Sequence, residues 1–75
     1  MPKFPILTAL KLIKILKKEG FTLIRSSGSH QTFYNESTKK IVAIPVHRGH
    51  DLGRGITRAI IEDAGYAEDE FLRLL

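Results

Sequence analysis

The apolar residues near the start of the chain follow the spacing of an amphipathic helix. They recur at positions i, i+3, i+4 and i+7, which share one helix face: Ala9, Leu12, Ile13 and Leu16. Thr8 can cap this helix, and Gly20, which tolerates a left-handed backbone, can end it after Glu19. Pro2 and Pro5 disfavour regular structure before residue 6. The pattern therefore predicts a helix from about Thr8 to Glu19.

Three short β-prone runs follow, at residues 21–25, 31–34 and 41–46. The segments between them, 26–29 and 35–38, are rich in turn-forming residues. Pro45 cannot donate a hydrogen bond to a sheet, so it belongs near a strand end or at a sheet edge. Phe33 and Tyr34 are neighbours and must point to opposite faces of their strand. One is expected in the core, and the other is either a half-exposed aromatic or a ring that stacks on a base.

A loop over residues 47–53 leads into a second amphipathic helix, for which Asp51 is a candidate N-cap. The expected apolar stripe of this helix, ended by Gly65, is Ile56, Ala59, Ile60 and Ala64. Arg58 and Glu62 stand four residues apart and are expected to pair on its exposed side. Residues 68–75 are expected to form a short last helix with an acidic first turn. Its expected buried residues are Phe71, Leu72 and Leu75, and Phe21 is also expected in the core.

The predicted order is therefore α-β-β-β-α with a short C-terminal helix. Strands joined by tight turns favour an antiparallel meander, and amphipathic helices need a sheet face on which to bury their stripes. No repeat or low-complexity segment divides the chain. We expect residues 1–75 to form a single α+β domain of two layers, a three-stranded antiparallel sheet with helices on one face.

The distribution of charge favours a polyanionic partner. Residues 1–58 hold eleven of the twelve Lys and Arg and only three of the eight acids, whereas residues 59–75 hold five acids and one Arg. A basic body with an acidic end is typical of nucleic-acid binding on one side, although ordinary solvation is the alternative. Lys11, Lys14 and Lys18 lie opposite the apolar stripe of the first helix, where they either follow a phosphate backbone or form a solvated face.

Composition argues against several classes of protein. The chain has no cysteine, which excludes disulfides and thiolate metal sites. No apolar run reaches the roughly 18 residues needed to cross a bilayer, so we expect a soluble, cytoplasmic protein. His47, His50 and Asp51 do not form a closed ligand set, and no metal or other cofactor is expected. No phosphate-binding glycine motif or nucleophile elbow is present, and paired carboxylates are missing from the basic part.

The tripeptide Gly28-Ser29-His30 is the sharpest chemical feature. It falls in a turn between two predicted strands, where glycine allows a tight bend and close approach of a ligand. Histidine can move a proton near neutral pH. RNA carries its own nucleophile, the 2′-hydroxyl, so a ribonuclease needs only such a group and cations that offset phosphate charge. Arg25 and Arg48 can supply the cations. The alternative is a turn histidine with no role beyond solvation.

Val46-His47-Arg48-Gly49-His50 offers two more histidines in a basic loop. His47 is a candidate second proton-transfer group, and Arg48 a candidate phosphate contact. The alternative is that both histidines are polar loop residues, an interpretation that we favour slightly for His50.

Together these motifs resemble the HicA toxin family over nearly the whole chain. The resemblance rests on a lysine-rich first helix followed by Gly20-Phe21, Arg25, Gly28-Ser29-His30, Phe33, Ile44-Pro45-Val46-His47-Arg48-Gly49, Leu52, Gly55, Ala64-Gly65 and Glu70-Phe71-Leu72. The sequence departs from the family pattern at His50, where lysine is common, and at Gly55-Ile56-Thr57, where glycine-threonine-leucine is common.

The resemblance implies a fold like that of double-stranded-RNA-binding domains. It further implies an mRNA endoribonuclease that inhibits translation and is neutralised by a HicB-type antitoxin. The essential histidine of the family corresponds to His30, with Gly28 and Ser29 as the turn that presents it. We expect the antitoxin to cover this turn and the His47 loop. Two alternatives remain: an RNA-binding module that recognises A-form shape and phosphate without cleavage, and an interaction domain for an acidic partner chain.

Overall fold

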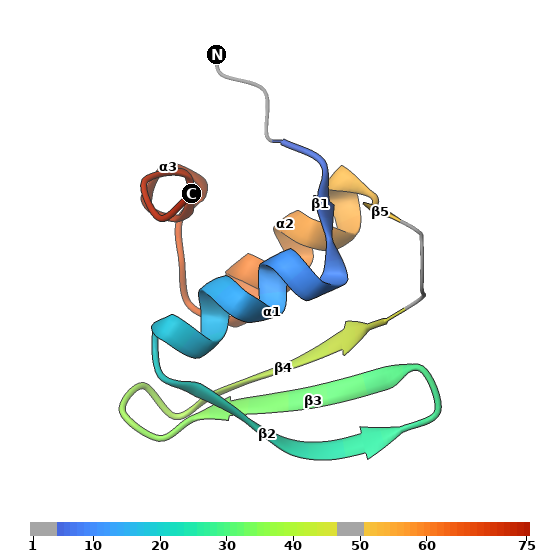
Figure 1. Cartoon of the computed structure of the whole chain (residues 1–75). Helices are drawn as coiled ribbons and strands as arrows, with labels where there is room; N and C mark the ends of the chain where they lie inside the picture. Colours follow the sequence, from blue (N-terminus) through green and yellow to red (C-terminus); the bar gives the residue numbers. More distant parts are fainter. Residues whose placement is uncertain (1–4, 47–50) are drawn as a thin grey trace.

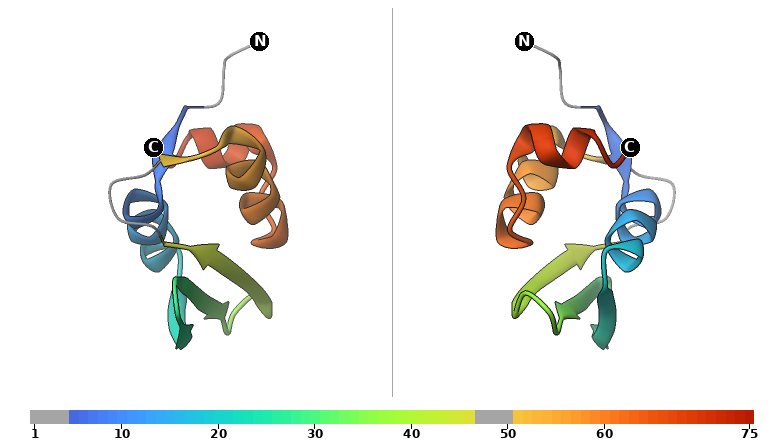
Figure 2. Two further views of the ribbon diagram at one scale, coloured as in Figure 1. Left: turned by 90° about the vertical axis from the view of Figure 1, so that its right-hand side faces the viewer. Right: turned by 90° about the vertical axis from the view of Figure 1, so that its left-hand side faces the viewer.

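The computed structural model describes residues 5–46 and 51–75 and places helices over one face of a three-stranded sheet (Figure 1). In chain order the elements are β1 (Leu7–Thr8), α1 (Ala9–Lys18), β2 (Phe21–Ser27), β3 (His30–Asn35), β4 (Lys40–Pro45), β5 (Asp51–Leu52), α2 (Arg54–Asp63) and α3 (Glu68–Leu72). Figure 2 shows α1 on the side of β2 and α2 on the side of β4. The predicted two-layer α+β architecture is confirmed.

The sheet has the order β2-β3-β4, and both strand pairs are antiparallel. Phe33 lies in the central strand, opposite Leu23 on one side and Val42 on the other. The register of β2 shifts between Leu23 and Arg25, which is a β-bulge at Ile24. The expected meander is therefore present, with an irregularity in its first strand.

A two-residue turn at Gly28 and Ser29 joins β2 to β3. Ser27 faces His30 across this turn. Gly28 has a φ of 58°, and Ser29 is not among the residues with positive φ, which is the pattern of a type II′ turn. This turn type twists in the same sense as the strands that it joins, so it fixes the register in which β3 begins.

The first helix follows its predicted pattern closely. Its four apolar stripe residues are buried, and the Thr8 hydroxyl oxygen accepts a hydrogen bond from the Lys11 backbone N–H at 3.2 Å. Gly20 has a φ of 103° and reverses the chain into β2. Phe21, Phe33 and Phe71 are also buried and belong to the same hydrophobic core as this stripe.

Asn35 is a buried polar residue that joins three segments. Its side-chain amide donates to the Glu19 carbonyl oxygen at 3.0 Å, across the end of α1. Its amide oxygen accepts from the backbone N–H groups of Ser37 and Thr38, at 3.0 and 3.3 Å. The residue is 3% exposed, so these bonds fix the path of the turn between β3 and β4 in a place that water barely reaches.

The second half of the chain corrects several expectations. Asp51 does not cap α2, because it lies in β5 opposite Thr8 of β1, and the N-cap is Gly53. This short β1–β5 ladder was not predicted, and no periodicity indicates strands of two residues. Arg58 does not pair with Glu62, because Arg58 Nη2 lies 3.2 Å from Glu68 Oε1 of α3.

The buried face of α2 is rotated by about one residue from the predicted one. Ile56 is 50% exposed and Ala59 is also exposed. The residues that pack inward are Thr57, Ile60, Ile61 and Ala64. Thr57 can be buried because its hydroxyl donates to the Gly53 carbonyl oxygen at 3.0 Å, which satisfies the polar group while its methyl packs.

The last helix is shorter than predicted, since α3 ends at Leu72. Phe71 is buried and Leu72 is partly buried, as expected. Leu75 is 50% exposed, so its assignment to the core was wrong. It falls beyond the helix, where a helical stripe no longer dictates which way a side chain points.

Candidate active site on the open face of the sheet

One face of the sheet lies away from the helices and carries three rows of side chains. Val42 and Ile44 of β4 are buried toward the helices, and successive strand residues alternate between faces. Cross-strand pairing then defines the rows on the other side, which we call the open face: Ser27, His30 and Pro45; Arg25, Thr32 and Ala43; Thr22, Tyr34 and Ile41. Neither view in Figure 2 shows a helix over this face.

His30 lies at one end of the open face, as the first residue of β3 after the Gly28-Ser29 turn. Its side chain is exposed, and its imidazole has no hydrogen-bond or ion-pair partner among the described residues. The ring is therefore not sealed in the apolar interior. A ligand that crosses this corner of the sheet can therefore contact the imidazole.

Arg25 shares the open face with His30 because of the β-bulge. Phe21 and Leu23 point toward the helices, and simple alternation would place Arg25 there too. The extra residue, Ile24, changes the phase, so that Arg25 pairs with Thr32 in the row next to His30. The structure thus brings together two of the residues predicted from the sequence.

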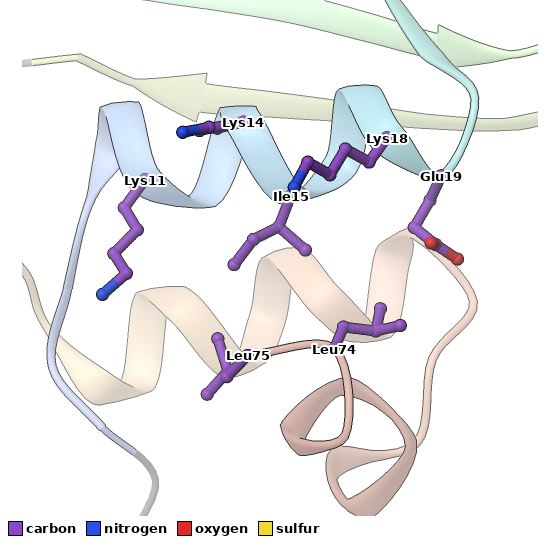
Figure 3. Close-up of a pocket in the computed structure, with 7 residues that line it drawn as sticks. All are labelled: Lys11, Lys14, Ile15, Lys18, Glu19, Leu74 and Leu75. Atoms are coloured by element: carbon purple, nitrogen blue, oxygen red, sulfur yellow. The ribbon is translucent and has the colours of Figure 1, made fainter.

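The predicted lysines lie elsewhere. Lys11, Lys14 and Lys18 line a pocket of about 160 Å³ between α1 and the end of the chain, with Ile15, Leu74 and Leu75 as its apolar part (Figure 3). Because α1 covers the opposite side of the sheet, these lysines do not share a face with His30. They remain candidates for contacts with phosphates outside the site, or a solvated rim.

His47 and Arg48, the remaining predicted site residues, lie outside the described residues. Val46, which precedes them, donates its backbone N–H to the carbonyl oxygen of Ser29. The described chain on the N-terminal side of His47 is therefore joined directly to the turn that presents His30.

The strands of the sheet carry no carboxylate. Residues 21–27, 30–35 and 40–45 include Arg25 and Lys40 and no Asp or Glu. Within residues 5–46 and 51–75, no cluster of three or more His, Asp or Glu side chains is arranged to hold a metal ion. In the same part of the chain, no helix has the length and apolar character needed to span a bilayer.

Sequence reasoning did not assign Thr32 to the site, and it left open which of Phe33 and Tyr34 lies in the core and which could stack on a base. The signal for Thr32 and Tyr34 was available, because residues 30, 32 and 34 alternate with the buried Phe33 and must share a face if residue 30 lies in the strand. The predicted strand began at residue 31 and so left His30 in the turn. The pairing of His30 with Ser27 shows that it belongs to β3.

The molecule is a small α+β domain, and the open face of its sheet carries an exposed histidine and an arginine. This architecture is compatible with the double-stranded-RNA-binding fold. The family model for the HicA toxin of bacterial toxin–antitoxin systems matches residues 10–66, which include the whole sheet and the Gly28-Ser29-His30 turn. The chain belongs to this family. It is therefore a toxin of a toxin–antitoxin pair, and its partner is an antitoxin. A search of curated proteins finds no match to the chain.

Proposed function

We propose that the chain is an endoribonuclease that cleaves mRNA without a metal ion and so inhibits translation. The observation that carries this proposal is the position of His30, exposed on a carboxylate-free sheet face with Arg25 in the next row. An imidazole can exchange protons with RNA at this place, and the guanidinium can hold a phosphate by paired hydrogen bonds.

The reaction uses the nucleophile of the substrate itself. The 2′-oxygen attacks the adjacent phosphorus, its proton passes to a base, and the bond from phosphorus to the 5′-oxygen breaks as that oxygen receives a proton. His30 serves this transfer as base, acid or both. Arg25 stabilises the extra negative charge on the phosphorane. His47 remains the sequence-based candidate for the second proton-transfer group, and Arg48 for a further phosphate contact.

The proposal is tested with purified protein and a labelled RNA in the presence of a chelator. Wild type is expected to yield a 2′,3′-cyclic phosphate and a 5′-hydroxyl end, and His30→Ala is expected to lose this activity by at least about 100-fold. Glu36→Gln, in the turn at the far end of β3, serves as the control and should cleave at the wild-type rate. Cleavage by folded His30→Ala at an unchanged rate, with folding checked by circular dichroism, would contradict the proposal.

The rival function is an RNA-binding module without cleavage. Both functions predict binding that weakens with salt, because phosphate contacts release counterions. Only the nuclease generates new RNA ends, so failure of wild type to do so would favour the rival. Lys11, Lys14 and Lys18 of α1 are proposed as outlying phosphate contacts. Changing all three to glutamine should lower the salt dependence of RNA binding without changing which bonds are cut.

We further propose that the antitoxin partner is of the HicB type and covers the turn from Gly28 to His30 together with the His47 loop. Neutralisation then requires no more than exclusion of RNA from the open face. In hydrogen exchange, the backbone N–H groups around Ser27 and His30 should gain protection in the complex. A neutralised complex in which this corner exchanges as in the free toxin would contradict this mode of inhibition.

A further inference from the structure

We infer that the open face binds its substrate as single-stranded RNA, and that Tyr34 stacks on a base near the bond that His30 cleaves. This inference rests on the proposed function and adds the form of the RNA and a residue that positions it. The observation that carries it is that Tyr34 lies on the same face and the same strand as His30, in a row that no helix covers.

The backbone holds Tyr34 firmly in place. It lies in the central strand, opposite Thr22 on one side and Ile41 on the other, and the Thr22 hydroxyl donates to its carbonyl oxygen at 3.4 Å. Its neighbour Phe33 is 0% exposed and fixes the direction of the strand. The Tyr34 ring is therefore partly exposed on the open face and does not take part in the core.

The separation of the two residues suits a short length of RNA. Tyr34 lies four positions after His30 in the strand, which corresponds to about 13 Å at the rise of a β-strand. A stacked nucleic-acid strand covers this distance with about four nucleotides at roughly 3.4 Å each, and an extended strand needs fewer. A phosphate at His30 and a base on Tyr34 can thus belong to the same stretch of RNA, with Arg25 and Thr32 between them.

The chemistry of the face favours a single strand over a duplex. Among the nine residues of the three rows on the open face, Arg25 is the one with a formal charge. The others carry hydroxyl, aromatic or apolar side chains. An aromatic ring beside a cation binds any unpaired base by stacking, whereas the bases of a duplex present only their edges. Side chains on a sheet also cannot read the deep, narrow major groove of A-form RNA. Of the two forms, the open face therefore fits unpaired RNA.

The open face also carries apolar residues, so an experiment must distinguish binding of RNA from binding of a protein partner. Ile41 is 55% exposed and lies next to Tyr34 in its row. The absence of carboxylates from the sheet and the presence of Arg25 suit a polyanion, and they favour RNA as the occupant when the toxin is free.

The chain allows a direct optical test, because it has two tyrosines and no tryptophan. The double variant His30→Ala, Tyr66→Phe cannot turn over substrate under the proposed function, and it leaves Tyr34 as the single tyrosine. Titration with a single-stranded RNA oligonucleotide should quench the tyrosine emission, and the same sequence as a duplex should not. Equal quenching by the duplex, or none by the single strand at saturation, would overturn the inference.

Affinity and kinetics give the second readout. Tyr34→Leu should weaken binding of the single strand by about ten-fold or more, while Tyr34→Phe should bind as wild type. On a short substrate, Tyr34→Leu should raise KM more than it lowers kcat, whereas His30→Ala should lower kcat. Tyr66→Phe is the matched control for loss of a tyrosine elsewhere. If Tyr34→Leu binds RNA normally but no longer binds the antitoxin, the face around Tyr34 is a protein surface and the inference is wrong.

The two proposals can fail separately. If His30→Ala cleaves normally while Tyr34→Leu binds poorly, the stacking site stands and the catalytic assignment fails. If His30→Ala is inactive and Tyr34→Leu is indistinguishable from wild type, the catalytic assignment stands and the stacking site is wrong. Circular dichroism and a urea transition for Tyr34→Leu show whether that variant folds, and Tyr34→Phe tests retained stacking with minimal change to the strand.

Discussion

Replacement of Asn35 by alanine tests whether one buried amide holds the end of the sheet to the end of α1. The change removes three hydrogen bonds, to the Glu19 carbonyl oxygen and from the Ser37 and Thr38 N–H groups. A net value of about 1 kcal/mol for each bond gives about 3 kcal/mol as an upper figure. Ser37 and Thr38 are exposed and their N–H groups can bond to water, so we expect a loss of about 2–3 kcal/mol.

This loss is large for so small a domain. At about 0.05–0.15 kcal/mol per residue, a chain of 75 residues has a total stability of roughly 4–11 kcal/mol. The melting temperature of Asn35→Ala should fall by roughly 10–20 °C. Urea unfolding followed by circular dichroism measures the change directly. Ser37→Ala, which removes only an exposed hydroxyl in the same turn, is the control and should stay within about 0.5 kcal/mol of wild type.

The variant Asn35→Asp distinguishes the contribution of the bond that the amide donates from that of the two bonds that its oxygen accepts. It keeps the oxygen that accepts from the turn and loses the N–H donor to Glu19. Its deficit relative to wild type should shrink in acid, because a protonated carboxyl can donate again. Stability of Asn35→Ala within about 0.5 kcal/mol of wild type would refute the reasoning, since it would mean that water replaces all three bonds at no cost.

Two further predictions concern glycines and Tyr66. Gly28→Ala should lose about 1–3 kcal/mol of stability and reduce RNA cleavage, because its φ of 58° is unfavourable for alanine although its Cβ would meet nothing within 4 Å. Gly55→Ala, in the first turn of α2, should instead stabilise by up to about 1 kcal/mol, and equal effects at the two sites in urea unfolding would contradict this account. Burial and the neighbouring Glu19 carboxylate raise the pKa of Tyr66 from 10.0 to about 12, so its contribution to stability should be present below pH 10 and be lost as the pH rises toward 12. The urea midpoint should fall over that range less steeply in Tyr66→Phe than in wild type, and parallel curves would show that another group is responsible.

The position of the lysines changes how the toxin should be pictured on RNA. Charge alone suggested one basic surface. The lysines belong to α1, which lies over the helix-covered face of the sheet (Figures 1 and 3), whereas Arg25 lies in a row of the open face. Under the proposed function, cleavage depends on the open face, and the α1 lysines contact phosphates outside that face. Variants of the open face should therefore change kcat and KM, whereas variants of the α1 lysines should change the salt dependence of RNA binding.

Local periodicity was enough to determine much of the architecture. The stripe of α1, its Thr8 cap, the end at Gly20 and the placement of Phe33 and Tyr34 on opposite faces all depend on residues that are close together in the sequence. Such features follow from the 3.6-residue and two-residue repeats of helices and strands, which hold wherever the element finally packs. The order of the elements and the α+β class could be predicted for the same reason.

Tertiary contacts decided which residues face one another. Packing against β4 and α3 decided which face of α2 is buried. This packing buries Thr57, whose hydroxyl is hydrogen-bonded to the Gly53 carbonyl oxygen, and leaves Ile56 exposed. The β1–β5 ladder depends on segments more than forty residues apart, and a two-residue strand has no pattern of its own. The partner of Arg58 likewise came from α3 and not from its own helix.

The candidate site shows most clearly which features follow from local sequence and which depend on the folded structure. That a histidine follows a glycine turn in a basic chain could be predicted without the structure, because residue type and turn chemistry are local. Only the folded sheet decided that His30 begins a strand, and that the bulge at Ile24 turns Arg25 toward it. A bulge is a property of how two strands pair, and one inserted residue moves every later side chain of that strand to the other face.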